Sequence, residues 1–195
     1  MTFLVFSTIY ICKRNKQMKN KIAYIPGQFD ECEKKALEEF EKMAKRLPKI
    51  FHSFTGTASG SRVDVMSENI TGGCASVELK LRHKNTAKYG DCFIEPEKFA
   101  ALKRIWEEKG YFPIYINFIG DYKDVYAFYI PEIERYELHP NVKIKHQNGE
   151  YTWEDRYGLH WEDAHHFILQ DDDTYEEIKP KNVKTINIKA NKYNG

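Results

Sequence analysis

Three residues, Asp64, Glu78 and Lys80, have the types and the spacing of a metal-dependent hydrolytic site. Side chains two residues apart on a β-strand point to the same face, so Glu78 and Lys80 would lie side by side. Two carboxylates with room for water suit Mg²⁺ or Mn²⁺, which can polarise a phosphoryl oxygen and lower the pKa of an attacking water. A neighbouring ammonium group can orient that water. The pattern predicts phosphodiester hydrolysis, with Asp64 and Glu78 as metal ligands and Lys80 as the catalytic cation.

Hydrophobic periodicity predicts the elements that must position these residues. Leu37 and Phe40 belong to an apolar stripe at helical spacing, while Pro96 and Gly110 are typical of the first position of a helix and of the position after its end. In chain order we expect a helix over 30–47, strands over 62–66, 76–82 and 91–95, a helix over 96–109, and strands over 111–119 and 125–130. This order predicts an α/β fold with a mixed central β-sheet flanked by helices.

The string Val63-Asp64, followed by Glu78-x-Lys80, resembles the motif of the PD-(D/E)xK nuclease superfamily, which includes restriction endonucleases, Holliday junction resolvases and phage exonucleases. Val63 stands at a position where the family name has Pro and where the family is loose. The resemblance extends over about residues 30–130, because the element order agrees with the family's α-β-β-β-α-β core. It implies a restriction endonuclease-like fold, a Mg²⁺- or Mn²⁺-dependent nuclease with DNA as the expected substrate, and a phage, mobile-element or repair setting.

The resemblance also implies two further site residues. Family members often carry a metal-binding Glu on the first helix. On a helical wheel that includes the residues just ahead of this helix, Glu33 falls inside the apolar arc. A carboxylate there is costly unless it is paired or metal-bound, so Glu33 is the expected third ligand. On the second helix Lys98 lines up with Leu102 and Ile105, where it would contact the scissile phosphate. Helix capping by Glu33 and a snorkelling Lys98 are the alternative interpretations.

A basic loop follows the strand that carries the catalytic pair. Arg82, Lys84 and Lys88 would neutralise phosphates that flank the cleaved bond, and Tyr89 could stack on a base. An ordinary solvated loop is the alternative. The formal net charge is only +1, from 30 basic and 29 acidic residues, which excludes the class of strongly basic nucleic-acid-binding proteins. A carboxylate metal site adds negative charge that its cation offsets, so a nuclease remains compatible with this balance.

The cysteines and histidines give weaker support for zinc or disulfide chemistry than the carboxylates give for a magnesium site. Four cysteines occur without a CxxC pair, which argues against a zinc knuckle and a disulfide scaffold and favours a reducing, cytoplasmic setting. A cluster in the C-terminal part raises an alternative zinc hypothesis. Its members are His160, Asp163, His165 and His166. Neighbouring Trp161 and Phe167 instead favour ordinary packing.

Three regions are expected along the chain. Residues 1–18 are interpreted as an extension that is disordered or precedes a true start at Met18, with a weak membrane anchor as the alternative. A nuclease-like core is predicted over 19–135, and a C-terminal extension packed on that core over 136–195. A homodimer is compatible with the sequence, and no membrane partner is expected. A non-catalytic module of the same fold that binds nucleic acid or protein is the alternative function.

Overall fold

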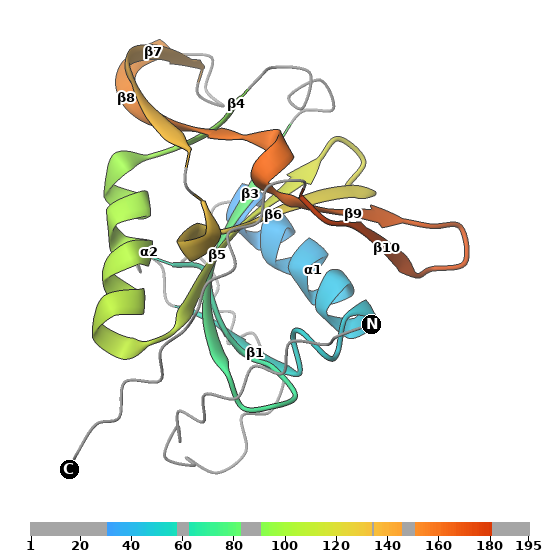
Figure 1. Cartoon of the computed structure of the whole chain (residues 1–195). Helices are drawn as coiled ribbons and strands as arrows, with labels where there is room; N and C mark the ends of the chain where they lie inside the picture. The colour runs from blue at the N-terminus through green and yellow to red at the C-terminus, as the bar shows by residue number, and fades with distance from the viewer. Residues whose placement is uncertain (1–30, 58–62, 83–90, 134, 146–150, 181–195) are drawn as a thin grey trace, which may run out of the picture.

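The computed structural model describes residues 31–57, 63–82, 91–133, 135–145 and 151–180 (Figure 1). In chain order the elements are α1 (Glu31–Arg46), β1 (Ser53–Gly56), β2 (Val65–Glu68), β3 (Cys74–Arg82), β4 (Asp91–Ile94), α2 (Pro96–Lys109), β5 (Phe112–Ile119), β6 (Asp124–Tyr129), η2 (Ile130–Glu132), β7 (Tyr136–Lys145), β8 (Tyr151–His160), η3 (Trp161–Asp163), β9 (His165–Leu169) and β10 (Tyr175–Ile178). The expected N-terminal extension lies outside the described residues.

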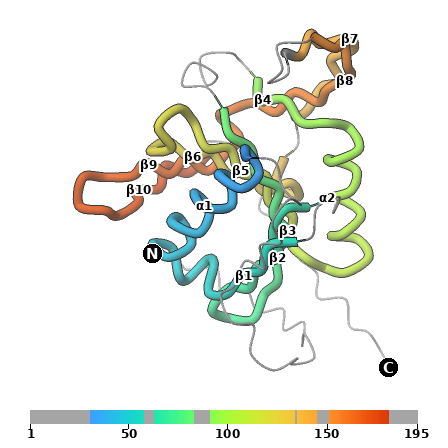
Figure 2. The backbone as a smooth tube through the Cα atoms, turned by 180° about the vertical axis from the view of Figure 1, so that it is seen from behind, coloured from blue at the N-terminus to red at the C-terminus, as the bar shows by residue number. Residues whose placement is uncertain are grey.

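The central sheet has seven strands in the order β1-β2-β3-β5-β6-β9-β10. Strands β3 and β5 are parallel, with α2 between them in the chain, and the other neighbours are antiparallel. Helices α1 and α2 lie on different sides of these strands in both views (Figures 1 and 2). The prediction of an α/β fold with a mixed central sheet is therefore confirmed.

Alternation along β3 separates an apolar face from a polar one. Val77 and Leu79 are buried in a hydrophobic cluster with Leu37 and Phe40 of α1. Glu78, one residue away from each, points to the side of the sheet that α2 covers. The register pairs it with Tyr115 of β5, which packs in the second hydrophobic cluster with residues of α2. A central strand between two helices thus buries both of its faces, and the polar residues of β3 become part of the interior.

Strand β4 differs from its predicted place. The segment was expected to be a strand of the central sheet, but β4 pairs with β8 in a separate three-stranded sheet of order β4-β8-β7. The third strand ahead of α2 is supplied instead by β1, for which no strand was predicted and which pairs with β2. The predicted C-terminal extension contributes strands to both sheets, because β9 pairs with β6 and β8 pairs with β4.

The observed boundaries of the two helices agree closely with those predicted from the sequence. Helix α2 spans the predicted residues, with Pro96 at its start and Gly110 in the left-handed conformation (φ 67°) just past its end. Helix α1 begins one residue later and ends one residue earlier than expected. Within the described part of the chain, neither helix is both long and apolar enough to cross a membrane.

Candidate active site

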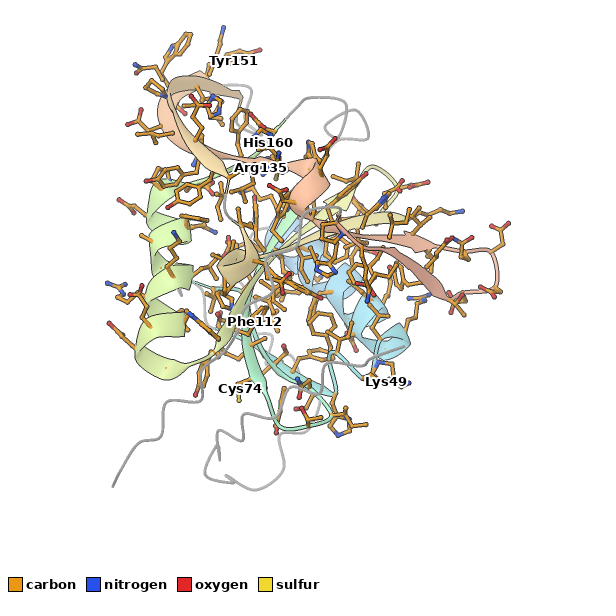
Figure 3. The ribbon with its side chains drawn as sticks, viewed as in Figure 1. Lys49, Cys74, Phe112, Arg135, Tyr151 and His160 are labelled. Atoms are coloured by element: carbon orange, nitrogen blue, oxygen red, sulfur yellow. The ribbon has the colours of Figure 1, made fainter. Side chains whose placement is uncertain are left out.

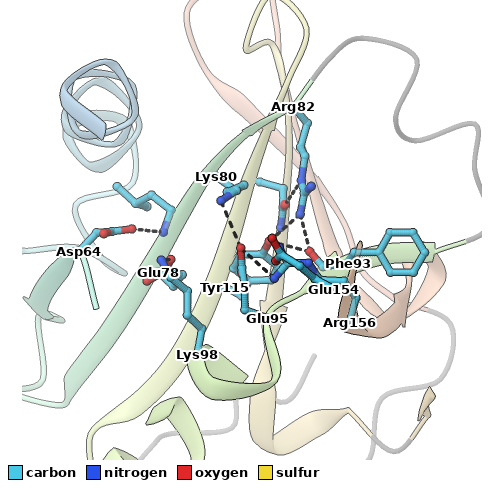
Figure 4. Close-up of polar contacts among 12 residues, drawn as sticks. Asp64, Glu78, Lys80, Arg82, Phe93, Glu95, Lys98, Tyr115, Glu154 and Arg156 are labelled. Atoms are coloured by element: carbon cyan, nitrogen blue, oxygen red, sulfur yellow. Dashed lines mark hydrogen bonds and ion pairs between the residues drawn. The ribbon is translucent and has the colours of Figure 1, made fainter. Parts of the chain in front are cut away.

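Asp64 and Glu78 lie next to each other at the start of β2 and the middle of β3. Asp64 immediately precedes β2, and its N–H donates to the carbonyl of Val77 at 3.0 Å, which continues the antiparallel ladder. One oxygen of the Asp64 carboxylate accepts the N–H of Leu79 at 2.7 Å. Since Glu78 lies between these two β3 residues, the hydrogen bonds hold Asp64 beside the Glu78 side chain (Figure 4).

The Glu78 carboxyl group is almost completely buried, with 1% of its side chain exposed. Burial and then the nearby charge of Asp64 raise its pKa from 4.5 to about 7. Burial also raises the pKa of Asp64, against the opposing effect of the hydrogen bond from Leu79. The second oxygen of Glu78, Oε2, is buried and accepts no hydrogen bond from the part of the chain that the structure describes. Asp64 and Glu78 are thus two adjacent carboxyl groups with raised pKa values, and one oxygen of Glu78 is available to a ligand. Such a pair of oxygen donors fits a hard divalent cation.

Lys98 supplies a positive charge at this pair. Its ammonium group donates to Oε1 of Glu78 from the first turn of α2 (Figure 4). Burial alone would lower the pKa of Lys98, but the charges of Glu78 and Asp64 outweigh that effect and raise it. The prediction that Lys98 faces inward near the site agrees with this position. Its partner here is the Glu78 carboxylate.

Lys80 and Glu95 form the next pair along the site. The Lys80 ammonium group lies 3.6 Å from Oε1 of Glu95, the N-cap residue of α2. The same oxygen lies 3.2 Å from the Arg156 guanidinium of β8, which is also paired with Glu154. Burial would raise the pKa of Glu95, but Lys80, a backbone N–H and Arg156 together bring it below its ordinary value. Glu95 therefore stays ionised and joins β3 to the second sheet.

Arg82 is engaged inside the fold, on the same face of β3. It donates to the Tyr115 hydroxyl at 2.7 Å, to the Phe93 carbonyl, and to the Asn117 side-chain oxygen at 3.0 Å. These bonds fasten β4 to the central sheet. The structure thus gives Arg82 a structural role in place of the predicted phosphate contact. The other predicted members of the basic loop, Lys84 and Lys88, lie outside the described residues, as does Tyr89.

The prediction that Glu33 faces the core is wrong. Its side chain is exposed in the first turn of α1, whereas Ala36, Leu37 and Phe40 form the buried face of that helix. Helix α1 packs against the face of β3 opposite to Glu78. The described residues contain no group of three or more His, Cys, Asp or Glu side chains that could hold a metal ion. Asp64 and Glu78 are the two of the three predicted metal ligands that the structure brings together.

The alternative zinc cluster does not converge on one point. Its four members each contact different partners: His160 contacts Asp91, Asp163 contacts Arg135, His165 contacts Glu132 and Glu177, and His166 contacts Asp124. The ordinary-packing interpretation holds for these residues. The thiol of Cys92 is fully buried, and this burial raises its pKa to about 11, so it is a poor nucleophile.

Glu95 and Arg156 are site residues that the sequence did not indicate. Glu95 read as the end of a strand before Pro96, and Arg156 falls in a segment of weak periodicity. The position of Glu95, three residues before Lys98 at the start of a helix, is the signal that could have placed it near the site. A comparison of the chain with protein families and with curated proteins gives no match to either.

Proposed function

We propose that this protein is a metal-dependent nuclease that hydrolyses phosphodiester bonds in DNA. One observation carries the proposal: the half-buried Asp64 and the buried Glu78 are neighbours, and Oε2 of Glu78 has no hydrogen-bond partner among the described residues. A buried acceptor without a partner is costly, and a bound cation would relieve that cost. With β4 set aside because it belongs to the second sheet, the order α1-β1-β2-β3-α2-β5, with β3 and β5 parallel, supports the restriction endonuclease-like core that the motif implies.

The chain's own groups divide the work. Asp64 and Glu78 would hold Mg²⁺ or Mn²⁺, which when bound polarises the phosphoryl oxygen and acidifies a water. Lys80 is 39% exposed and lies on the same face of β3, so it can orient the nucleophile and balance charge at phosphorus. Glu95 and Arg156 fix the direction in which Lys80 points. Lys98 neutralises Glu78 and, once a cation takes that role, can turn to the phosphate.

A second candidate function has a specific observation in its favour. Both lysines of the site already have carboxylate partners, Lys98 with Glu78 and Lys80 with Glu95. A network of this kind would serve a non-catalytic module that binds nucleic acid or protein. The placement of Asp64 beside Glu78 argues against it, because two neighbouring carboxylates repel each other and a purely structural network gains nothing from that repulsion.

The test is cleavage of a panel of linear, circular, branched and single-stranded DNA with and without Mg²⁺. The native chain should cleave at least one substrate only when the metal is present. Glu78→Gln should abolish that activity by removing a ligand, and Lys80→Ala should reduce it by orders of magnitude. Lys109→Ala, an exposed lysine at the end of α2, is the matched control and should retain full activity. Equal inertness of all four proteins, with DNA binding intact, would favour the module.

A further inference from the structure

Strands β7 and β8, which we call the arm, carry most of the exposed large hydrophobic side chains. Of six such residues in the described part of the chain, four belong to the arm: Tyr136, Leu138, Tyr151 and Trp153. Trp153 is 65% exposed and Tyr151 is 53% exposed. In Figure 3, Tyr151 lies at the end of the arm farthest from the central sheet, with Arg135 and His160 at its base.

The exposed rings share one face of the arm. Tyr151, Trp153 and Tyr157 alternate along β8, and the register places Lys143 opposite Trp153 and Leu138 opposite Tyr157. At the base of the arm this face packs on α2, where the Tyr157 ring lies 5.2 Å from that of Phe99. Beyond that contact the face continues into solvent. The pattern is a line of aromatic rings that begins at α2 and runs outward.

Lysines are interleaved with these rings. The Lys143 ammonium group lies 4.3 Å from the centre of the Tyr151 ring and 5.9 Å from that of Trp153. On α2 itself, the Lys103 ammonium group lies 4.5 Å from the centre of the Tyr136 ring. The carboxylate on the same face, Asp155, accepts the N–H of Asn141 at 3.1 Å. The face therefore presents rings and ammonium groups together, which is the surface chemistry that binds single-stranded nucleic acid.

We infer that the arm binds a single-stranded segment of nucleic acid by stacking its unpaired bases on Tyr151 and Trp153, with Lys143 facing the phosphates. The inference rests on the proposed nuclease function for its direction, because the arm is joined to the catalytic strand. Arg156, three residues along β8 from Trp153, contacts Glu95, the partner of Lys80. Three residues of a strand span about 10 Å, so Trp153 lies about that far along β8 from Arg156, on the opposite face of the strand, and the arm is joined to the site through β8. The substrate class is then DNA with an unpaired tail, flap or loop.

The experiment measures binding alone, in the full chain carrying Glu78→Gln and in EDTA. A fluorescein-labelled oligothymidylate and a blunt duplex are titrated, and anisotropy and tryptophan fluorescence are recorded. We expect tighter binding of the single strand, with quenching of tryptophan emission. Adding Trp153→Ala should weaken that binding about tenfold. Ile70→Ala, a residue of similar exposure on the β2–β3 turn, is the control and should change nothing. Lys143→Met should reduce the slope of log affinity against log salt by about 0.7.

Three outcomes would overturn the inference. The first is equal affinity of Trp153→Ala and Ile70→Ala for the single strand, and the second is equal affinity of the native arm for single strand and duplex. The third is a native dimer that Trp153→Ala converts to a monomer without a change in DNA affinity, which would make the face a contact between two copies. A chain that binds single strands through the arm but never cleaves DNA would support the inference and refute the nuclease. A chain that cleaves equally well without Trp153 would do the reverse.

Discussion

Replacing Glu78 with Gln is expected to stabilise the fold above neutral pH, because the ionised carboxylate is buried. Burial, and then the charge of Asp64, raise the Glu78 pKa from 4.5 to about 7. Between these values the folded state binds more protons than the unfolded state, so stability falls as the pH rises. The difference, 7 − 4.5 = 2.5 pH units at 1.36 kcal/mol each, corresponds to a loss of about 3 kcal/mol. The attraction of Lys98 is already contained in this pKa.

Urea unfolding followed by tryptophan fluorescence measures this effect. At about pH 8.5 Glu78→Gln should be more stable than the native chain by up to about 3 kcal/mol, and at about pH 4 the two should be equal. Glu107→Gln, an exposed carboxylate on α2, is the control and should show no gain at either pH. Mg²⁺ should stabilise the native chain at the higher pH and leave Glu78→Gln unchanged. Equal stability of native and Glu78→Gln chains at about pH 8.5 would show that the ionised Glu78 carboxylate does not destabilise the fold.

Three other predictions concern the groups around the site and the second sheet. Lys98→Met should tighten Mn²⁺ binding at alkaline pH several-fold, because the competing cation on Glu78 is gone; looser binding would contradict this. Gly158→Ala should cost about 1–3 kcal/mol in urea unfolding, because its Cβ would lie 2.6 Å from His139 Nε2, and an unchanged midpoint would argue against that packing. Burial opposes protonation of His165, but the two flanking carboxylates, Glu132 and Glu177, outweigh burial and raise the His165 pKa. The contribution of protonated His165 to the stability of the fold is therefore complete below about pH 6.5 and is lost as the pH rises through the pKa of the folded state. His165→Asn should therefore destabilise the fold more at about pH 6 than at about pH 9, and a pH-independent loss would contradict this sign.

The helices and β3 were predictable because their signals are local. The apolar stripe of α1, the Pro96 and Gly110 boundaries of α2, and the alternation along β3 each lie within one element. Strand pairing is not local. Strand β4 pairs with β8, more than sixty residues later, and nothing in the short β4 segment distinguishes that partner from a neighbour in the central sheet.

The site was predictable where strand geometry fixes it and not where tertiary packing does. Asp64 and Glu78 meet through the antiparallel pairing that two adjacent strands predict. The prediction for Glu33 was wrong because the helical wheel included residues ahead of the first residue of α1. Including them shifted the predicted apolar arc by part of a turn. Glu95 and Arg156 could not be paired from the sequence, since their contact depends on how the two sheets are placed.

Electron paramagnetic resonance of free Mn²⁺, titrated with the protein at alkaline pH, shows directly whether Asp64 and Glu78 together hold a divalent cation. We expect the native chain to bind Mn²⁺ stoichiometrically, Asp64→Asn and Glu78→Gln both to lose this binding, and Glu107→Gln to keep it. Binding that survives in both site variants, or a native chain that binds no Mn²⁺ at all, would show that these two carboxylates do not form the metal site.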